Sequence, residues 1–262
     1  MEQTQNQNPT PYQFPTEEVT LPSQGLLYPA DSPLRKGVIE MKYMTAKEED
    51  ILTNQNLIKQ GNVIDKLLQS LIVTPFDFKE LLLGDKNAIL VAARILGYGA
   101  EYDCTMINPT SGEEEKVRID LTQAEDVYID KSKIIDGKNE FEFILPKSKI
   151  PITFQFMTHG LESKIDAELK GLKKINKKSH AELSTRLKHI ILAVDGDRDK
   201  KTIREFVDQK FLAMDARALR NYISDISPDI NLKFDIEFED GHVQEGVDIP
   251  VTIQFFWPDA GI

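Results

Sequence analysis

The sequence predicts an α+β fold: a mainly helical body with two or three antiparallel β-hairpins and an extended, proline-rich N-terminal arm. Three observations lead to this fold class. Apolar residues recur at helical spacing in two long stretches, alternating segments flank turn sequences elsewhere, and six of the 13 prolines lie at or before Pro33. We divide the chain into an arm over residues 1–35, a helical lobe followed by hairpins over residues 36–158, and a helical lobe ending in a C-terminal hairpin over residues 159–262.

The arm combines low complexity with large apolar side chains. Residues 1–18 are rich in Gln, Asn, Thr and Pro, which is typical of a disordered or partner-dependent tail. The next stretch, "LPSQGLLYP", has two prolines around a turn, so regular structure is disfavoured. A proline-rich segment loses little entropy on docking, and we expect it to lie along a neighbouring protein. The candidate partner-binding residues of the arm are Leu21, Pro22, Gly25, Leu26, Leu27 and Tyr28.

The first lobe begins with the alternating segment "KGVIEMKY", which predicts one short strand. Thr45 and Glu48 then form a capping box, and Gly61 is placed to stop a helix. Thr74-Pro75 offers another helix start. We predict helices over residues 45–60, 63–72, 75–83 and 84–97, followed by a hairpin of "YDCTMI" with "KVRIDL" and two further strands, "EFEFILP" and "IPITFQF".

The second lobe returns to helical spacing. Leu161, Ile165, Leu169, Leu172 and Ile175 form a narrow apolar stripe whose other faces are rich in lysine. A capping box over Ser179–Glu182 predicts a helix that buries Leu183, Leu187, Ile190, Ile191 and Val194. Helices over 200–210 and 215–226 follow, and "LKFDIEFED" pairs with "IPVTIQFFWP" in a final hairpin. The segment "GDKNAILVAARILGYGAEYDC" resembles "MDARALRNYISDISPDINLKF", which favours two α+β lobes.

Three aromatic residues, Phe255, Phe256 and Trp257, stand near the C-terminus. Strand alternation would bury Phe255 and Trp257 on one face and turn Phe256 to the other. Two interpretations stay open: the chain's own domain covers both faces, or a neighbouring subunit completes one of them. We include the three residues among the candidate partner-binding positions.

Composition excludes several classes of function. The net charge of -11 disfavours binding to nucleic acid or an anionic membrane, and no apolar run is long enough to span a bilayer. The N-terminus does not look like a secretory signal, and the single cysteine, Cys104, fits a reducing cytoplasm. The lysines over residues 164–178 could meet an acidic partner or nucleic acid, but a solvated helix face is the favoured interpretation.

No sequence motif indicates a catalytic site. The four histidines are scattered, and "DGDRDK" lacks the glycine and glutamate that an EF-hand needs at its sixth and twelfth positions. Cys104 has no adjacent cation to activate it. We therefore predict no catalytic residue, no cofactor, no metal site and no small-molecule substrate. A hydrolase, or a nucleic-acid adaptor using residues 164–188, remain the competing classes.

Three segments together resemble the baseplate hub proteins of T-even-like contractile-tailed bacteriophages: "LPSQGLLYP", "GVIEMKYMTAKEEDILTNQNLIKQGNVIDKLLQSLI" and "LLLGDKNAILVAARILGYGAEY". The resemblance covers roughly Leu21 to Trp257. It implies a structural or assembly protein of the tail baseplate, not an enzyme, that binds other tail proteins.

The resemblance leaves two possible roles open. The chain is either a permanent hub component, located in the virion tail, or an assembly chaperone that acts in the host cytoplasm and is absent from the finished particle.

Some relatives carry paired cysteines suited to a zinc ribbon, whereas Cys104 stands alone here. Deleting residues 1–30 is expected to leave a folded monomer that fails to join its complex.

Overall fold

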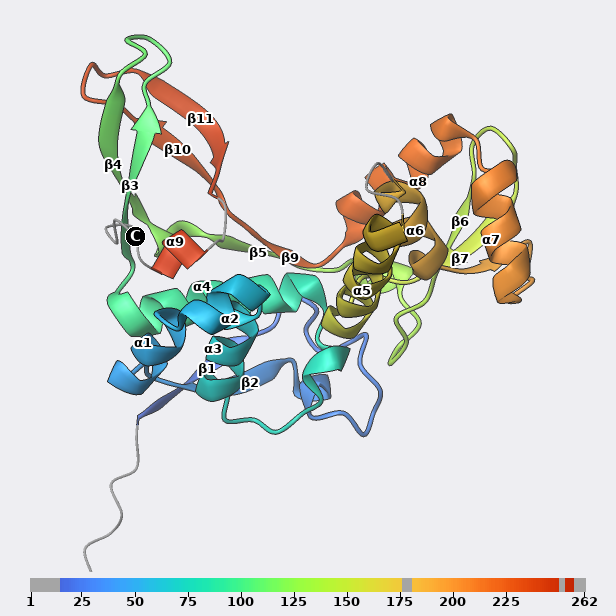
Figure 1. The fold of residues 1–262 in the computed structure, drawn as a ribbon, viewed down its shortest axis with the longest axis horizontal. Helices are drawn as coiled ribbons and strands as arrows, with labels where there is room; N and C mark the ends of the chain where they lie inside the picture. Colours follow the sequence, from blue (N-terminus) through green and yellow to red (C-terminus); the bar gives the residue numbers. More distant parts are fainter. Residues whose placement is uncertain (1–14, 176–180, 250–252, 257–262) are drawn as a thin grey trace, which may run out of the picture.

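The computed structural model describes residues 15–175, 181–249 and 253–256, and it shows an α+β protein in which helices and small antiparallel sheets alternate along the chain (Figure 1). The described helices are α1 (Ala46–Leu52), α2 (Gln55–Gln60), α3 (Val63–Leu71), α4 (Leu83–Tyr98), α5 (His159–Ile175), α6 (Glu182–Ile190), α7 (Lys200–Gln209), α8 (Ala213–Ile226) and α9 (Ile253–Phe256).

The strands form four two-stranded sheets and one three-stranded sheet within the described residues. The pairs are β1 (Thr16–Thr20) with β2 (Val38–Lys42), β3 (Glu101–Ile107) with β4 (Glu114–Asp120), β5 (Glu125–Val127) with β9 (Asp229–Asn231), and β10 (Lys233–Glu237) with β11 (Val243–Asp248). The larger sheet has the order β6 (Phe141–Ile144), β7 (Pro151–Phe154), β8 (Ile191–Val194). All of these pairings are antiparallel.

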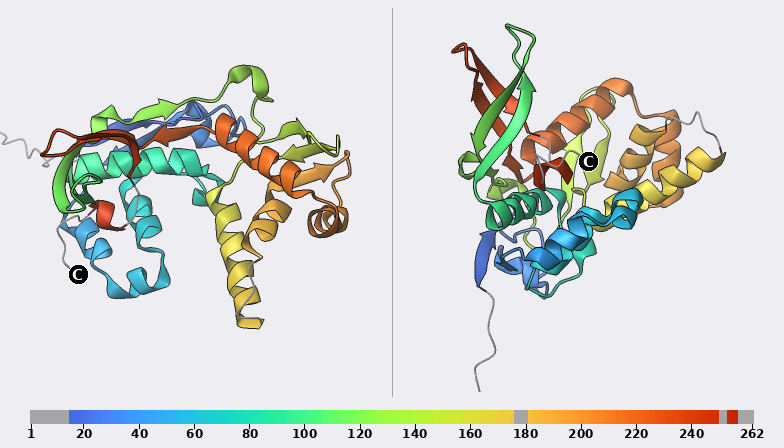
Figure 2. Two further views of the ribbon diagram at one scale, coloured as in Figure 1. Left: turned by 90° about the horizontal axis from the view of Figure 1, so that it is seen from above. Right: turned by 60° about the vertical axis from the view of Figure 1, so that its left-hand side comes forward.

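The long helix α4 organises the molecule. Figure 1 shows the hairpins β3–β4 and β10–β11 side by side at one end and the sheet β6–β7–β8 at the other, with β5 and β9 running between the two ends. Seen from above, α1–α3 and the pair α5–α6 project in the same direction from the layer that holds α4 (Figure 2). The strand pair β5–β9 therefore connects the two ends, and β9 packs against α4.

Several predicted elements are confirmed. The strand at residues 38–42 buries Ile39 and Met41, and the capping box between Thr45 and Glu48 opens α1. Gly61 ends α2 in the left-handed conformation, with φ of 73°, which a residue without a Cβ adopts at little cost. The hairpin β3–β4, the strands β6 and β7, and helices α3, α4, α5, α7 and α8 also form where they were expected.

Two helix predictions in the first half are wrong. The helix expected over residues 45–60 breaks, because the side chain of Asn54 accepts hydrogen bonds from the backbone N–H groups of Asn56 and Leu57 and so caps a new helix. The helix expected over residues 75–83 does not form beyond a single 3-10 turn. Backbone hydrogen bonds to the segment before α5 hold Leu81 and Leu83 instead.

Two predictions in the second half also need correction. The helix expected to continue through Val194 ends at Ile190, because Ile191–Val194 bury themselves as a third strand beside β7. Leu183 is exposed, and Ser179 and His180 of the expected capping box lie outside the described residues.

The final hairpin pairs with a nearer strand than expected. The backbone turns at Gly241, where the N–H of Phe238 donates to the carbonyl of His242, so β10 pairs at once with residues 243–248. Phe255 and Phe256, predicted to lie in the last strand, fold instead into the short helix α9.

The arm predicted over residues 1–35 is wrong for its described part. Residues 16–20 are a strand paired with β2, and the turns that follow pack into the core. Strand pairing also crosses the predicted division at residue 158, because β7 pairs with β8, and the hairpin β10–β11 contacts the first half through a hydrogen bond from the Glu239 N–H to Glu115.

Candidate functional site

The predicted partner-binding residues of the arm lie inside the chain's own fold. Leu21 is fully buried, Leu27 and Tyr28 are each 3% exposed, and Pro22 and Gly25 are buried as well. Leu26 is half-buried at the rim. The expectation that this segment leaves apolar side chains uncovered is therefore wrong.

A buried carboxylate explains why the segment turns inward. Asp85, on the first turn of α4, accepts hydrogen bonds from the Ser23 N–H at 2.9 Å, the Ser23 hydroxyl at 2.7 Å and the Tyr28 hydroxyl at 2.6 Å. The Tyr28 oxygen in turn accepts from the Leu82 N–H at 3.0 Å. Burial raises the pKa of Asp85 and raises the pKa of Tyr28 well above its usual value. Asp85 therefore fixes the loop to the helix.

The C-terminal aromatic residues are covered in the same way. Phe255 is fully buried and Phe256 is 1% exposed. Phe255 packs against Tyr102 with ring centroids 5.2 Å apart, and its carbonyl accepts from Arg94 Nε at 3.0 Å. Trp257 lies outside the described residues. Of the two interpretations of this segment, coverage by the chain's own fold holds for Phe255 and Phe256.

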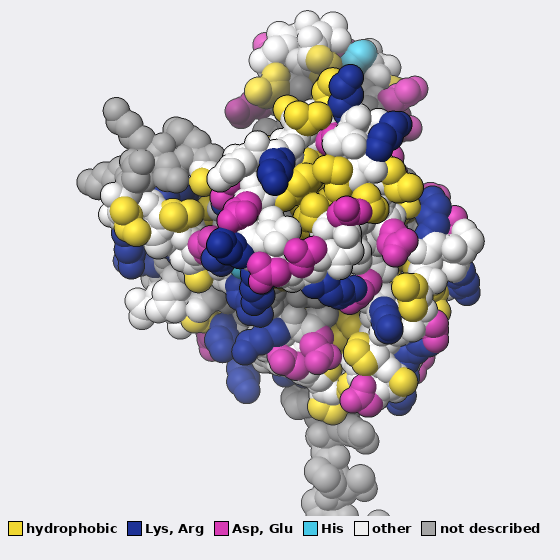
Figure 3. Space-filling model, turned by 90° about the vertical axis from the view of Figure 1, so that its right-hand side faces the viewer, with side chains coloured by type: hydrophobic (Ala, Val, Ile, Leu, Met, Phe, Trp, Pro, Cys, Tyr) yellow, Lys and Arg dark blue, Asp and Glu magenta, His cyan; other side chains and the backbone are white. Residues whose placement is uncertain are grey.

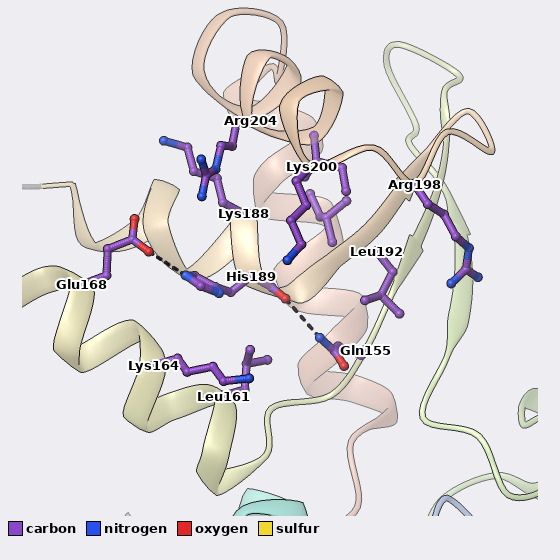
Figure 4. A pocket seen from close by; sticks show the side chains of 12 residues that line it. Gln155, Leu161, Lys164, Glu168, Lys188, His189, Leu192, Arg198, Lys200 and Arg204 are labelled. Carbon is purple, nitrogen blue, oxygen red and sulfur yellow. Dashed lines mark hydrogen bonds and ion pairs between the residues drawn. The ribbon is translucent and has the colours of Figure 1, made fainter.

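A pocket of about 400 Å³ between α5, α6, β8 and α7 is the strongest candidate site. We call it the basic pocket. Figure 4 shows side chains from the three helices surrounding it, with Lys164 and Lys200 on opposite sides of the same space. Its polar lining consists of Gln155, Lys164, Glu168, Lys188, His189, Arg198, Lys200 and Arg204, and its apolar lining of Leu161, Ile191, Leu192 and Ile203.

Three cations of the basic pocket lack an ion pair among the described residues: Lys164, Lys200 and Arg204. The other cations are matched, as Lys188 Nζ lies 2.6 Å from Asp208 and Arg198 lies 2.6 Å from Glu140. Glu168 lies 2.8 Å from His189 Nε2. The Gln155 amide donates to the His189 carbonyl at 3.1 Å and so holds the floor of the pocket to the end of α6.

The unpaired cations are gathered at the basic pocket, whereas the wider surface carries charges of both signs. On the end of the molecule turned to the viewer in Figure 3, side chains of both signs are interspersed with apolar ones. A second pocket of about 420 Å³ adjoins the first, sharing Gln155, Leu161 and Lys164, and it reaches Pro29. The two pockets therefore meet near the start of α5.

The basic pocket can bind anions next to apolar groups, but it holds no nucleophile with a matching base. Cys104 lies on β3, and burial raises the pKa of its thiol. Among the described residues, no three His, Cys, Asp or Glu side chains gather as a metal site would require, and no helix has the length and apolarity needed to cross a membrane.

Sequence reasoning identified only part of this pocket. Lys164 belongs to the predicted lysine cluster, whereas Lys188, Lys200 and Arg204 carried no signal of their own. Their convergence depends on β8, which turns the chain so that α7 lies beside α6. The spacing of apolar residues predicts a helix over Ile191–Val194, so spacing alone could not reveal the pocket.

Comparison with known protein families decides the identity. The family described as T4 bacteriophage base plate protein matches residues 16–257. The chain belongs to this family. The T4 base plate family match covers every helix and strand of the described structure, and it supports a bacteriophage baseplate protein without singling out the hub. Neither the curated proteins nor the solved structures contain a match to the chain.

Proposed function

We propose that this protein is a structural or assembly component of the baseplate hub, working through protein–protein contacts without catalysis. The family match over residues 16–257 supports the baseplate role, and the resemblance of residues 21–102 to hub proteins supports the hub. The basic pocket supports it, because an open groove with unpaired cations and an apolar floor suits a polypeptide partner better than a reacting substrate. The partners are other tail or baseplate proteins, and nucleic acid, membrane and small-molecule substrates have no role.

Loss of the gene from a phage that encodes this protein tests the proposal. We expect infected cells to accumulate heads and incomplete tails, and a plasmid copy of the wild-type gene to restore complete baseplates seen by electron microscopy. Normal baseplates in the absence of the protein would overturn the proposal.

Within this proposal two roles are distinguished, a permanent hub component and an assembly chaperone that is absent from the finished virion. Mass spectrometry of purified particles separates the two. A permanent component is present in a fixed ratio to other baseplate proteins, whereas a chaperone is found in infected cells and is missing from the finished virion. In either case the protein is made in the host cytoplasm.

A further inference from the structure

The two halves of the chain repeat the same order of local contacts. In each half a Leu-Pro pair follows a strand, at Leu21-Pro22 and at Leu145-Pro146. In each half the backbone just after that pair donates to an aspartate at the third position of a later helix. The Ser23 N–H donates to Asp85 in α4, and the Lys147 and Ser148 N–H groups donate to Asp215 in α8.

The next elements match residue by residue. The strands β2 and β7 both lead into an aromatic-Met-Thr sequence, Tyr43-Met44-Thr45 and Phe156-Met157-Thr158, and a helix starts directly after each threonine. The residues that follow α3 and α6, Ile72 and Ile191, have almost the same extended backbone angles. Ile72 bridges Met41, just as Ile191 pairs with Phe154, which fixes the alignment of the halves.

In the first half, a buried carboxylate lies where β2, α1 and α3 meet. Glu48 is fully buried and accepts hydrogen bonds from Lys42 Nζ at 2.8 Å, the Thr45 hydroxyl at 2.6 Å and the Ser70 hydroxyl at 2.7 Å. Glu48 and its three hydrogen-bond donors therefore fill this region with groups of the chain itself.

In the second half, the same region is open. The position of Glu48 is taken by Leu161, that of Lys42 by Gln155 and that of Ser70 by His189, and all three line the basic pocket. The acidic residue of the described lining, Glu168, lies against His189, while Lys164, Lys200 and Arg204 have no ion pair among the described residues. The second half thus lacks the internal acid, and its unpaired cations stand at positions other than that of Lys42, on α5 and α7.

We propose that the basic pocket receives an acidic side chain from a partner protein, in a segment that alternates acidic and apolar residues. The cations select the carboxylate, and Leu161, Leu192 and Ile203 accept the apolar neighbours. The lining contains no Phe, Tyr or Trp on which a base could stack, so a nucleic acid fits less well. The identity of the partner as a baseplate protein rests on the proposed function, whereas the chemistry of the segment rests on the pocket alone.

The test measures binding of a short fluorescein-labelled peptide that alternates Glu and Leu, using fluorescence anisotropy with the full chain at low ionic strength. We expect saturable binding, and binding at least about tenfold weaker for the same peptide with Gln in place of Glu. Reversing two unpaired cations, in K164E/R204E, should cause a similar loss. The matched control is K47E/K59E, which makes the same change in net charge at exposed lysines of the first half and should bind like the wild type.

A second variant supplies the missing acid. Leu161→Glu reproduces in the second half the residue that the first half has at Glu48, and it should compete with the peptide and reduce its affinity by about tenfold or more. Leu161→Gln, of similar size and without charge, should retain more of the binding. Circular dichroism of each variant checks that the fold is kept.

Several results would overturn the proposal: no saturable binding of the Glu-Leu peptide, equal affinity for the Gln-Leu peptide, or unchanged binding by K164E/R204E. Displacement of the peptide by a DNA duplex would assign the pocket to nucleic acid, and displacement by low inorganic phosphate would reduce it to a small-anion site. Peptide binding does not depend on whether the protein enters the virion, so failure here is distinct from failure of the proposed function.

Discussion

Single residues decide how the N-terminal segment folds. Tyr28 joins the N-terminal segment to the start of α4, because its hydroxyl donates to Asp85 and accepts from the Leu82 N–H. A buried polar group that loses its partner costs far more than an exposed one. The loop over residues 21–28 is therefore fixed by hydrogen bonds as well as by its apolar side chains.

Tyr28→Phe should lower the free energy of unfolding by about 1–3 kcal/mol, since it removes a donor to Asp85 and leaves the Leu82 N–H without an acceptor. Urea denaturation followed by circular dichroism measures the change. The matched control is Tyr128→Phe, which removes a hydroxyl that contacts Asp126 on an exposed side chain and should change stability by less than about 0.5 kcal/mol. Equal effects of the two substitutions would contradict the role given to Tyr28.

Glu48 makes the stability of the fold depend on pH, and the direction of that dependence follows from its pKa. Burial alone would raise its pKa, but hydrogen bonds from Lys42, Thr45 and Ser70 outweigh burial and lower the pKa from 4.5 to about 2. A carboxyl whose pKa is lower in the folded state stabilises the fold above the unfolded pKa. That contribution is complete above about pH 4.5 and is lost as the pH falls towards about 2.

Glu48→Gln should therefore destabilise the protein by about 1–3 kcal/mol at pH 7, and the gap to the wild type should shrink between about pH 4.5 and pH 2. Urea titrations at several pH values measure this gap. Glu142→Gln, at an exposed position of β6, serves as the control and should be nearly neutral throughout. A gap that stays constant down to pH 2 would show that Glu48 acts through its shape alone.

At the scale of elements, close backbone contacts set where α4 can lie. Gly84, near the start of α4, approaches the segment before β9 so closely that an added Cβ would lie 1.8 Å from the Pro228 carbonyl oxygen. Gly171, inside α5, has no atom within 4 Å of the same added position. One glycine is required by packing and the other is not.

Gly84→Ala should destabilise the protein by about 1–3 kcal/mol or more, because the backbone of α4 or of Pro228 must move. Gly171→Ala should stabilise it by about 0.5–1 kcal/mol, as expected for alanine in an open helix position. Thermal unfolding of both variants under one set of conditions checks the opposite signs. A neutral Gly84→Ala would mean that α4 and β9 are not in close contact.

At the scale of the whole molecule, charge is distributed unevenly. The two hairpins, residues 101–120 and 233–248, hold twelve acidic residues and three basic ones, whereas residues 159–210 hold thirteen Lys and Arg against nine Asp and Glu. The net charge of -11 therefore comes mostly from the two hairpins, and it gives no indication of the basic pocket at the other end of the molecule. A whole-chain charge is a poor guide to the partner of one surface.

The N-terminal segment belongs to the folded body of the molecule. Deleting residues 1–30 removes β1, which pairs with β2, together with Leu21, Leu27 and Tyr28 from the core. We now expect the shortened chain to lose its cooperative thermal unfolding transition, instead of remaining a folded monomer. Calorimetry beside the full-length chain measures this, and a cooperative transition in the shortened chain would restore the idea of a separable arm.

The sequence by itself determined most of the local structure. Helix periods, the capping box at Thr45 and the stop at Gly61 depend on neighbours in the chain. They predicted the start of α1, the helices α3, α4, α5, α7 and α8, and the β3–β4 hairpin. The family resemblance was likewise carried by residues readable in order, and the match over residues 16–257 confirms it at the level of a baseplate protein.

Only the tertiary structure decided what the apolar ends and the scattered cations do. Leu21, Tyr28 and Phe255 are equally apolar whether a partner or the chain itself covers them, and the choice depends on distant groups such as Asp85 and Arg94. Strand β8 forms because β7 offers an edge, and its turn brings Lys164, Lys200 and Arg204 to one pocket. Contacts between residues far apart in sequence leave no periodic signal, so spacing alone could not reveal them.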